Sequence, residues 1–466
     1  MKKPVEGIVT EPGSWRNELE PRVLDEVVYI VDSFREHGID IGVVADDGGL
    51  GYMYAERQLL VRDQYLHRVL EILRPPDDPD RSPDDPDRTA DDPDRAADDP
   101  DRVERDPERV RPVIAGVVLL TLSERQLSVP EALTEIDRRL GKGIATPNQI
   151  LTLAGEGGGC PATEPQEVYD GTEPYPSVCQ DNGGHGVLIY MADMGLLPDP
   201  AAGHPWLAGV GGQADPGSGQ QPIPPYTGHG TFVAGVARCM APAADIIVTN
   251  AFSIAGSKLE SDLVPELVAA LGLGVDIFHL TIAMPSREDI PLVAFEAWLR
   301  LLRQYKGVVC VVAAGNSGSR RPSWPAAFSE VVSVGALAGD WRSRASFSNF
   351  GGWVDVYAPG RDLVNAYATG TYKCHVTPYK GRERHFYGMA KWSGTSFSTP
   401  IVTGLIAARM TRTGENGREA AAALLAEARA QAIPGVGAIL LPRCDGERGR
   451  PAGRGGCCCE RRSCDC

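Results

Sequence analysis

The chain has 466 residues, which suggests two or three folded units, and its 42% of hydrophobic residues is enough for a sizeable core. Its formal net charge is -16. A surface that binds nucleic acid needs clustered Lys and Arg, so this charge argues against nucleic acid as a partner. Because no run of 18 consecutive apolar residues occurs, we expect no transmembrane helix and no membrane partner.

The N-terminus and the cysteines favour an intracellular location. The first residues, MKKPVEGIVTEPGSW, lack the apolar stretch of a signal peptide. Most cysteines are scattered through the chain without a spacing pattern. We therefore expect a cytoplasmic protein.

Residues 1–74 predict an N-terminal α/β segment. A helix near residues 23–35 and a strand near residues 39–44 come first, and their role stays open. Residues 58–61 are strand-like, and residues 64–73 carry apolar side chains at helical spacing.

An acidic repeat over residues 75–111 interrupts this segment. It consists of four copies that begin DDPDR, followed by the decayed copy RDPERVR. The Pro in every copy removes a backbone donor and clashes with the preceding helical turn, and no apolar positions recur. We predict a disordered acidic spacer, with a specific binding role as the alternative.

Residues 112–155 predict the remainder of the interrupted α/β unit. A strand over 115–122, a helix over 129–140 and a strand over 148–153 complete the order β-α-linker-β-α-β, which is compatible with a split βαβ sandwich. Residues 156–185 are rich in Gly, Pro and acidic residues and predict a flexible linker.

Residues 186–442 predict the main domain. Continuous apolar strands alternate here with helical patterns, which indicates an α/β fold with a parallel sheet covered on both faces. The expected strands cover residues 187–192, 246–249, 277–282, 308–313 and 331–334. Residues 443–466 predict a disordered Cys-rich tail. Its cysteines could instead bind a soft metal, although their spacing matches no known finger pattern.

Four positions in the main domain carry the residue types that acyl transfer needs. Asp193 ends an apolar strand, and His229 begins a helical pattern. Asn316 follows another apolar strand, and Ser396 lies in a tight turn before a helix. An imidazole can take the proton of a serine hydroxyl, and a buried carboxylate fixes the imidazole tautomer. An Asn amide and the Ser396 backbone N–H can hold the developing oxyanion. Each position alone is a weak signal, but the four in this order are improbable by chance.

Residues 186–442 resemble the subtilases, the subtilisin-like serine proteases. HGTFVAG is similar to the histidine block of that family, AAGN to its oxyanion block and GTSFSTP to its serine block. Residues 324–360 also resemble the region between the last two blocks. The resemblance implies a subtilisin-like parallel sheet flanked by helices and a serine endopeptidase (EC 3.4.21) that acts on proteins or peptides through an acyl-enzyme, without a cofactor.

The same resemblance assigns roles to residues. It implies a triad of Asp193, His229 and Ser396, with Asn316 in the oxyanion hole. The order Asp, His, Ser is the one known for subtilisin itself. A substrate would lie extended between two edge segments, and the implied substrate-binding residues are Gly256, Ser257, Lys258, Thr281, Ile282, Ala283 and Gly315.

Three departures from the family pattern stand out. Met194 replaces the usual Ser or Thr, which removes a hydroxyl beside Asp193, so we expect His229 to be held less firmly. Ala283 replaces the usual Gly, which predicts a narrower specificity pocket. The loop after the histidine helix is shortened at residues 239–242, so we expect no calcium or other metal site.

The N-terminal α/β unit resembles the propeptide of secreted relatives, which assists folding and then blocks the active site. We therefore expect intramolecular inhibition, relieved by a cut between about residues 155 and 186. Two alternatives remain. One is a non-catalytic binding module with a silenced triad, and the other is an esterase. The absence of a G-x-S-x-G elbow and the Asp-His-Ser order speak against the esterase.

Overall fold

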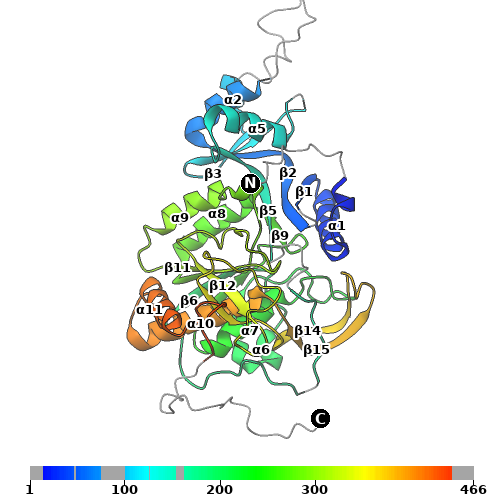
Figure 1. Ribbon diagram of the computed structural model, residues 1–466. Helices are drawn as coiled ribbons and strands as arrows, with labels where there is room; N and C mark the ends of the chain where they lie inside the picture. Colours follow the sequence, from blue (N-terminus) through cyan, green and yellow to red (C-terminus); the bar gives the residue numbers. More distant parts are fainter. Residues whose placement is uncertain are drawn as a thin grey trace, which may run out of the picture.

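The structure is a computed structural model that describes residues 14–46, 49–74, 100–124, 126–153, 162–169 and 171–442. Its larger sheet is parallel throughout and has the strand order β13-β12-β11-β10-β6-β8-β7 (Figure 1). The bounds of these strands are Leu188–Ala192 for β6, Val210–Gly212 for β7, Asp245–Thr249 for β8, Ile277–Leu280 for β10, Val309–Ala313 for β11, Val332–Leu337 for β12 and Val356–Pro359 for β13.

Helices cover both faces of this sheet. Along β6, Ile189 and Met191 point into one hydrophobic core, whereas Tyr190 and Ala192 point into the other. The first core is closed by α7 (His229–Met240), α10 (Thr395–Thr413) and α11 (Gly417–Ala430), and the second by α8 (Glu260–Ala270) and α9 (Val293–Leu302). The central strands are mostly apolar because both of their faces are buried. The expected parallel sheet flanked by helices is confirmed.

The N-terminal unit is an antiparallel sheet with helices. Its strand order is β3-β4-β2-β5-β9, with β1 paired to β2, and β9 is contributed by the main domain. Strand bounds are Ile41–Asp46 for β1, Gly49–Arg62 for β2, Val110–Ile114 for β3, Val117–Thr121 for β4, Ala145–Thr152 for β5 and Ser257–Leu259 for β9. The helices are α1 (Pro21–Glu36), α2 (Leu66–Leu73), α4 (Pro100–Val103) and α5 (Val129–Leu140).

The helix predicted over residues 129–140 is confirmed with the same bounds. The backbone N–H and the hydroxyl of Ser128 both donate to the carboxylate of Glu131, which closes a capping box at the start of α5. The strands and helices expected over 58–73 and 115–153 fit β2, α2, β4 and β5. Their order is compatible with the expected split sandwich.

Two expected boundaries differ from the structure. The spacer was expected to reach residue 111, but α4 and β3 already lie within its last copies, because Val103 is buried against α2 and β3 pairs with β4. The part of the spacer over 75–99 lies outside the described residues. The linker was expected to reach residue 185, but residue Ala162 already donates to Ser393 O over 3.0 Å, and Gln166 bridges to Lys391. The tail over 443–466 also lies outside the described residues.

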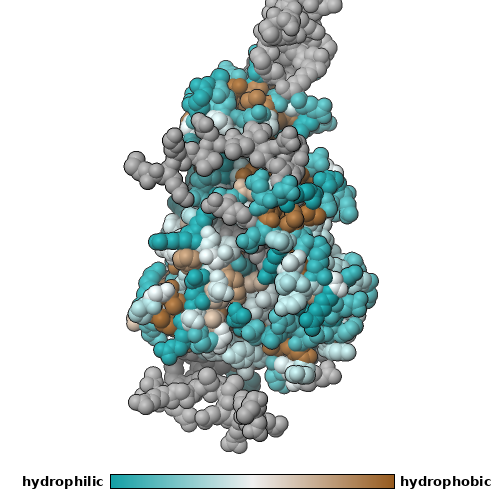
Figure 2. Space-filling model, turned by 45° about the vertical axis from the view of Figure 1, so that its right-hand side comes forward, coloured by the Kyte–Doolittle hydropathy of each residue, from teal (hydrophilic) through white to brown (hydrophobic). Residues whose placement is uncertain are grey.

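A long hairpin extends the main domain. It consists of β14 (Leu363–Lys373) and β15 (Glu383–Trp392). The remaining short helices are η1 (Ser14–Asn17), η2 (Asp63–Tyr65), α6 (Pro200–Gly203), η3 (Pro205–Leu207), η4 (Leu271–Leu273) and η5 (Arg287–Asp289). None of the helices in the described ranges is both long enough and apolar enough to cross a membrane. On the face drawn in Figure 2, hydrophobic residues gather only in small groups among hydrophilic ones.

One cysteine bears on the expected location. Cys179 is disulfide-bonded, whereas Cys239, Cys310 and Cys374 are buried and free. Disulfide bonds are typical of oxidising compartments. The cytoplasmic location therefore stays a prediction.

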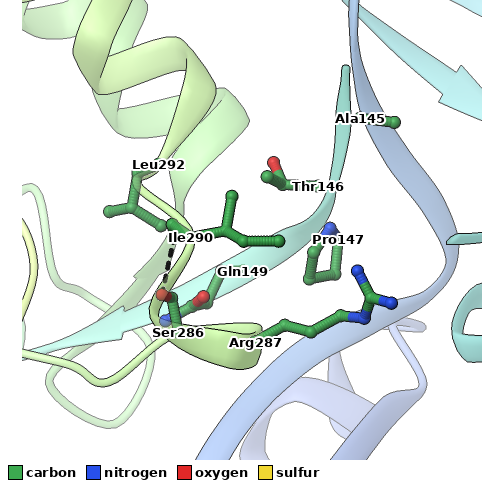
Figure 3. A pocket seen from close by; sticks show the side chains of 8 residues that line it. All are labelled: Ala145, Thr146, Pro147, Gln149, Ser286, Arg287, Ile290 and Leu292. Atoms are coloured by element: carbon green, nitrogen blue, oxygen red, sulfur yellow. Dashed lines mark hydrogen bonds between the residues drawn. The ribbon is translucent and has the colours of Figure 1, made fainter. Parts of the chain in front are cut away.

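A polar seam joins the N-terminal unit to the main domain. Asn148 Nδ2 donates to Ser261 Oγ over 3.0 Å, and the buried side chain of Arg287 forms an ion pair with Asp137 at 2.7 Å. A small pocket lies in this seam between β5 and residues 286–292 (Figure 3). The pocket is separate from the residues expected to be catalytic, which meet at the edge of the parallel sheet.

Candidate active site

Asp193 directly follows β6 and is completely buried. Its Oδ1 lies 2.7 Å from His229 Nδ1 and accepts the Met194 N–H at 2.8 Å. Its Oδ2 accepts the hydroxyl of Thr281 at 3.0 Å. Thr281 follows β10, the strand next to β6, so the parallel register delivers its hydroxyl to the carboxylate. The hydroxyl that Met194 fails to provide is thus supplied by Thr281, which the sequence analysis had not foreseen.

His229 is the first residue of α7 and is also completely buried. The N-cap of this helix, Gly228, has a φ of 82°, a left-handed conformation that glycine adopts without strain. The backbone N–H of Gly228 donates to Asp215 Oδ2 over 2.8 Å, and that of Gly217 donates to Asp215 Oδ1 over the same distance. Asp215 therefore fixes the turn from which the imidazole projects.

Asp215 is a carboxylate that the sequence analysis missed. It lies in a turn of Gly, Pro and Ser residues, and nothing in this composition distinguishes it from an exposed loop residue. In the structure it is only 2% exposed, and burial raises its pKa to about 6, although the two amides that it accepts lower it. The neighbouring charge of Asp193 raises it further.

Ser396 lies in the first turn of α10 and is completely buried. The residue before it, Thr395, donates its N–H to Asn316 Oδ1 over 2.8 Å and its hydroxyl over 3.0 Å. The hydroxyl of Thr395 also accepts the N–H of Gly315 at 3.1 Å. These bonds orient the Asn316 amide and attach its loop to the start of α10.

His229 lies in a cluster of aromatic rings that includes Phe397, the residue after Ser396. The ring of Phe397 lies 5.5 Å from the His229 ring, and the ring of Trp392 lies 5.7 Å from it on edge. Within the described residues, His229 Nε2 and Ser396 Oγ are buried polar atoms without a hydrogen-bond partner. A buried polar atom without a partner is costly, so each such atom calls for an explanation.

Two further residues that the sequence analysis missed support the site. Asn349 Nδ2 donates to Ala314 O over 2.9 Å, which holds the loop that carries Asn316. His279 lies on β10 and its Nδ1 is 2.8 Å from the hydroxyl of Thr403 on α10. Burial lowers the pKa of His279 to about 3, so its ring is neutral. Helical or strand spacing alone would class both residues as ordinary core positions.

Five of the seven residues expected to line a substrate flank one strand of the N-terminal unit, and a sixth, Thr281, donates its hydroxyl to Asp193. The end of β5 pairs antiparallel with β9, where Thr152 stands opposite Ser257 and Leu151 opposite Lys258. The N–H of Leu153 donates to Gly256 O over 3.0 Å. On the other side, Leu153 bridges to Ile282, and the N–H of Ala283 donates to Thr152 O over 3.3 Å.

The remaining expected residue, Gly315, faces Ala283. A Cβ atom added to Gly315 would lie 3.1 Å from the Cβ of Ala283 and 2.5 Å from Asn349 Nδ2, so only glycine fits here. Among the residues that the structure describes, no group of three or more His, Cys, Asp or Glu side chains could hold a metal ion.

The chain is similar to a known protein family and to several named proteins. The profile of the family described as the subtilase family matches residues 184–437. A thermophilic serine proteinase of Bacillus sp. (strain AK1) is 34% identical over 220 residues, which cover 45% of this chain and 48% of that protein. An intracellular serine protease of Paenibacillus polymyxa is 31% identical over 251 residues, which cover 50% of this chain and 69% of that protein.

Solved structures are also similar. The structure of the prenylagaramide maturation protease PagA matches with 25% identity and a TM-score of 0.42, over 53% of this chain and 84% of that chain. The chain spans about half the length of the first curated relative that it matches.

The buried carboxylate of Asp215 predicts a pH-dependent stability. Its pKa is about 6 in the folded state against an ordinary value of 3.8, so the folded chain binds more protons than the unfolded chain between about pH 4 and pH 6. Stability contributed by this group therefore rises as the pH falls through that window. Relative to Asp215→Asn, the wild type should gain on the order of 2 kcal/mol in unfolding free energy between pH 8 and pH 4.

Denaturant unfolding at a series of pH values measures this difference. A matched control is Asp199→Asn, because Asp199 is an exposed carboxylate a few residues beyond Asp193. An offset between the wild type and Asp215→Asn that stays constant from pH 4 to pH 8 would contradict the prediction.

Proposed function

Because the subtilase profile matches more than half of its length, the chain belongs to the subtilase family, and we propose that it is a serine endopeptidase. The observation that carries this proposal is the 2.7 Å contact between Asp193 and His229, combined with two orphaned atoms. His229 Nε2 and Ser396 Oγ are both buried, and neither has a hydrogen-bond partner among the residues that the structure describes. This arrangement fits a general base, His229, and a nucleophile, Ser396, in the absence of a substrate.

The proposed mechanism begins with proton transfer from Ser396 to His229. Ser396 Oγ attacks the carbonyl carbon of the scissile peptide bond while His229 Nε2 takes its proton. His229 then gives this proton to the leaving amine, and a water molecule later hydrolyses the acyl-enzyme in the same way. Asp193 holds the Nδ1–H tautomer of His229 and stabilises the imidazolium, with help from the Thr281 hydroxyl.

Asn316 is the proposed oxyanion donor, together with the backbone N–H of Ser396. Its amide oxygen accepts two hydrogen bonds from Thr395, and this orientation directs the NH2 group to the other side of the amide. Both donors lie at the start of α10, where the partial positive charge of a helix N-terminus favours an anion.

The proposed substrate is an extended stretch of protein or peptide chain. The segments around Gly256 and Ile282 offer backbone donors and acceptors on two sides, and β5 already uses both. Backbone pairing of this kind accepts many sequences, so selectivity must come from side-chain pockets. The proximity of Ala283 to Gly315 supports the expected narrow pocket.

We further propose that the intact chain inhibits itself. The end of β5 occupies the two edges that a substrate would need. Leu153 lies on one side of the site, and Ala162 is bonded to Ser393 O, three residues before Ser396. The chain between these points, residues 154–161, therefore links the two sides of the candidate site. The activating cut is proposed here, which narrows the expected range of 155–186.

The first test removes the proposed nucleophile. Ser396→Ala should lower peptide hydrolysis on the order of 10⁶-fold, the size known for subtilisin itself, and abolish labelling by a fluorophosphonate probe. The fold should persist, because the deleted oxygen bonds to no atom in the described part of the chain. Hydrolysis and labelling are measured on the trimmed protein, and folding by circular dichroism.

Ser398→Ala is the matched control for this test, since Ser398 lies in the same buried helical turn and its hydroxyl donates to Thr395 O over 3.0 Å. It should keep labelling and most of its activity. Retention of more than a few per cent of activity by Ser396→Ala would contradict the proposed mechanism.

The second test concerns the hydroxyl of Thr281. Thr281→Val keeps the shape of the side chain but removes one hydrogen bond to the Asp193 carboxylate. We expect kcat to fall about 10-fold with little change in KM, because a bond to a charged group contributes about 1.5 kcal/mol. Thr281→Ser should keep wild-type kinetics, and Met194→Thr should partly restore Thr281→Val. Unchanged kcat in Thr281→Val would show that Asp193 does not need this donor.

The third test concerns self-inhibition. A recognition sequence for an added protease of another class is placed within residues 154–161, and hydrolysis is followed before and after the cut. Activity should rise at least about 10-fold, because the end of β5 then competes with substrate without a covalent tether. The same recognition sequence placed within residues 443–466 is the control and should change nothing. Equal activity before and after the first cut would refute self-inhibition.

A further inference from the structure

The helix α1 makes contacts of its own with the main domain, apart from those of β5. Asp25 Oδ2 accepts the N–H of Thr377 at 3.0 Å and its hydroxyl at 2.8 Å, and Asp25 Oδ1 lies 2.5 Å from Lys380 Nζ. Thr377 and Lys380 belong to the tip of the β14–β15 hairpin, residues 374–382. Figure 1 shows α1 and this hairpin on the same side of the molecule.

A second set of contacts involves Tyr226. Glu26 Oε1 accepts the hydroxyl of Tyr226 at 2.9 Å, and Glu26 is only 4% exposed. The ring of Tyr29 stacks on that of Tyr226 with 6.5 Å between centroids and 12° between planes, and it lies 5.8 Å from the ring of His375. We call Tyr226, His375, Thr377 and Lys380 the α1-docking surface.

Both faces of α1 are in use. Its apolar side packs within the hydrophobic core that the N-terminal unit shares with the main domain, through Val23, Val27, Ile30, Val31 and Phe34. Tyr29 lies four residues after Asp25 and three after Glu26, so the three side chains share the other side, which in an ordinary surface helix would face water. Here that side meets the α1-docking surface. The sequence of α1 is therefore matched to the main domain as well as to its own unit.

The α1-docking surface adjoins the candidate active site. Tyr226 lies three residues before His229, and its carbonyl oxygen accepts the N–H of His229 at 3.1 Å. A Cβ atom added to Gly256 would lie 2.5 Å from the ring of Tyr226. Tyr226 thus stands between the proposed base and one edge of the substrate cleft.

We propose that the α1-docking surface is a second binding site of the main domain and that its occupant is α1 of this chain, which keeps the N-terminal unit bound after the chain is cut within residues 154–161. This proposal rests on the proposed self-inhibition. The end of β5 binds through backbone atoms and competes with any extended substrate, whereas α1 binds through side chains that an extended substrate does not displace. Two linked contacts hold the unit more tightly than either alone.

The test measures how fast the N-terminal unit leaves after the cut. The full chain carries Ser396→Ala and a recognition sequence within residues 154–161, so that release does not depend on activity. An added protease makes the cut, and release is followed by size-exclusion chromatography over time. The wild-type interface should release the unit slowly, on a scale of hours.

Asp25→Ala combined with Tyr29→Ala should speed release at least about 10-fold, since it removes the carboxylate bonds and the ring stack together. Lys380→Ala tests the same contact from the main domain and leaves α1 intact, so that a folding defect in α1 cannot explain both results. Lys380→Ala should speed release only about 3-fold, because the Lys380 side chain is 60% exposed and an exposed ion pair contributes little to binding.

Arg111→Ala is the matched control. Arg111 forms another ion pair across the two units, with Asp262 at 3.0 Å, but it lies away from α1. Release should change less than about 2-fold. Equal release rates in all variants, or immediate release from the wild-type interface, would overturn the proposal.

The same variants with Ser396 restored separate the two hypotheses. Hydrolysis that returns sooner after the cut in Asp25→Ala/Tyr29→Ala supports both. Hydrolysis together with a release rate that is the same in all variants would support the proposed endopeptidase and overturn the role of α1. Absence of hydrolysis in every variant would overturn the proposed function, while the release rates would still decide the role of α1.

Discussion

A carboxylate buried where parallel strands end is the constraint on which this site depends. Asp193 has no contact with water, so its charge must be balanced by donors from the protein. The neighbouring strand β10 delivers Thr281, the next backbone N–H comes from Met194, and His229 supplies the third donor. The Asp193 side chain therefore bonds both to the segment after β10, which the sheet register places beside it, and to the first residue of α7. A shift of either would remove one of the donors that balance the carboxylate.

Two further buried acidic side chains lie near this site, and each one links two segments of the chain through hydrogen bonds. Asp215 joins its own turn to the N-cap of α7. Glu260, at the start of α8, accepts the N–H groups of Ala294 and Phe295 at the start of α9, and burial raises its pKa to about 8. Since Glu260 follows β9 directly, it also anchors one edge of the proposed substrate cleft. Backbone amides at helix starts are natural partners for such groups.

The N-terminal unit uses two kinds of recognition on the main domain. At the cleft, β5 adds a strand to an open edge, and its pairing depends on backbone atoms that any extended chain possesses. At the α1-docking surface, recognition depends on Asp25, Glu26 and Tyr29, which few other chains would present in this order. The first contact explains why a protein substrate and the N-terminal unit would compete. The second contact explains why the N-terminal unit would bind more tightly than a substrate that lacks these side chains.

The amino-acid sequence by itself determined the parallel sheet, because its buried strands are mostly apolar. It also determined the segments of the candidate site, because Asp193, His229, Asn316 and Ser396 stand in recognisable local patterns. It also determined α5 to the residue, since Ser128 and Glu131 mark its start locally. Only the tertiary structure decided the role of Thr281, whose hydroxyl meets Asp193 through strand register. The same holds for Asp215 and for Glu26, whose partners are 13 and 200 residues away. Contacts over such distances leave no periodic trace in the sequence, because they depend on how whole elements pack.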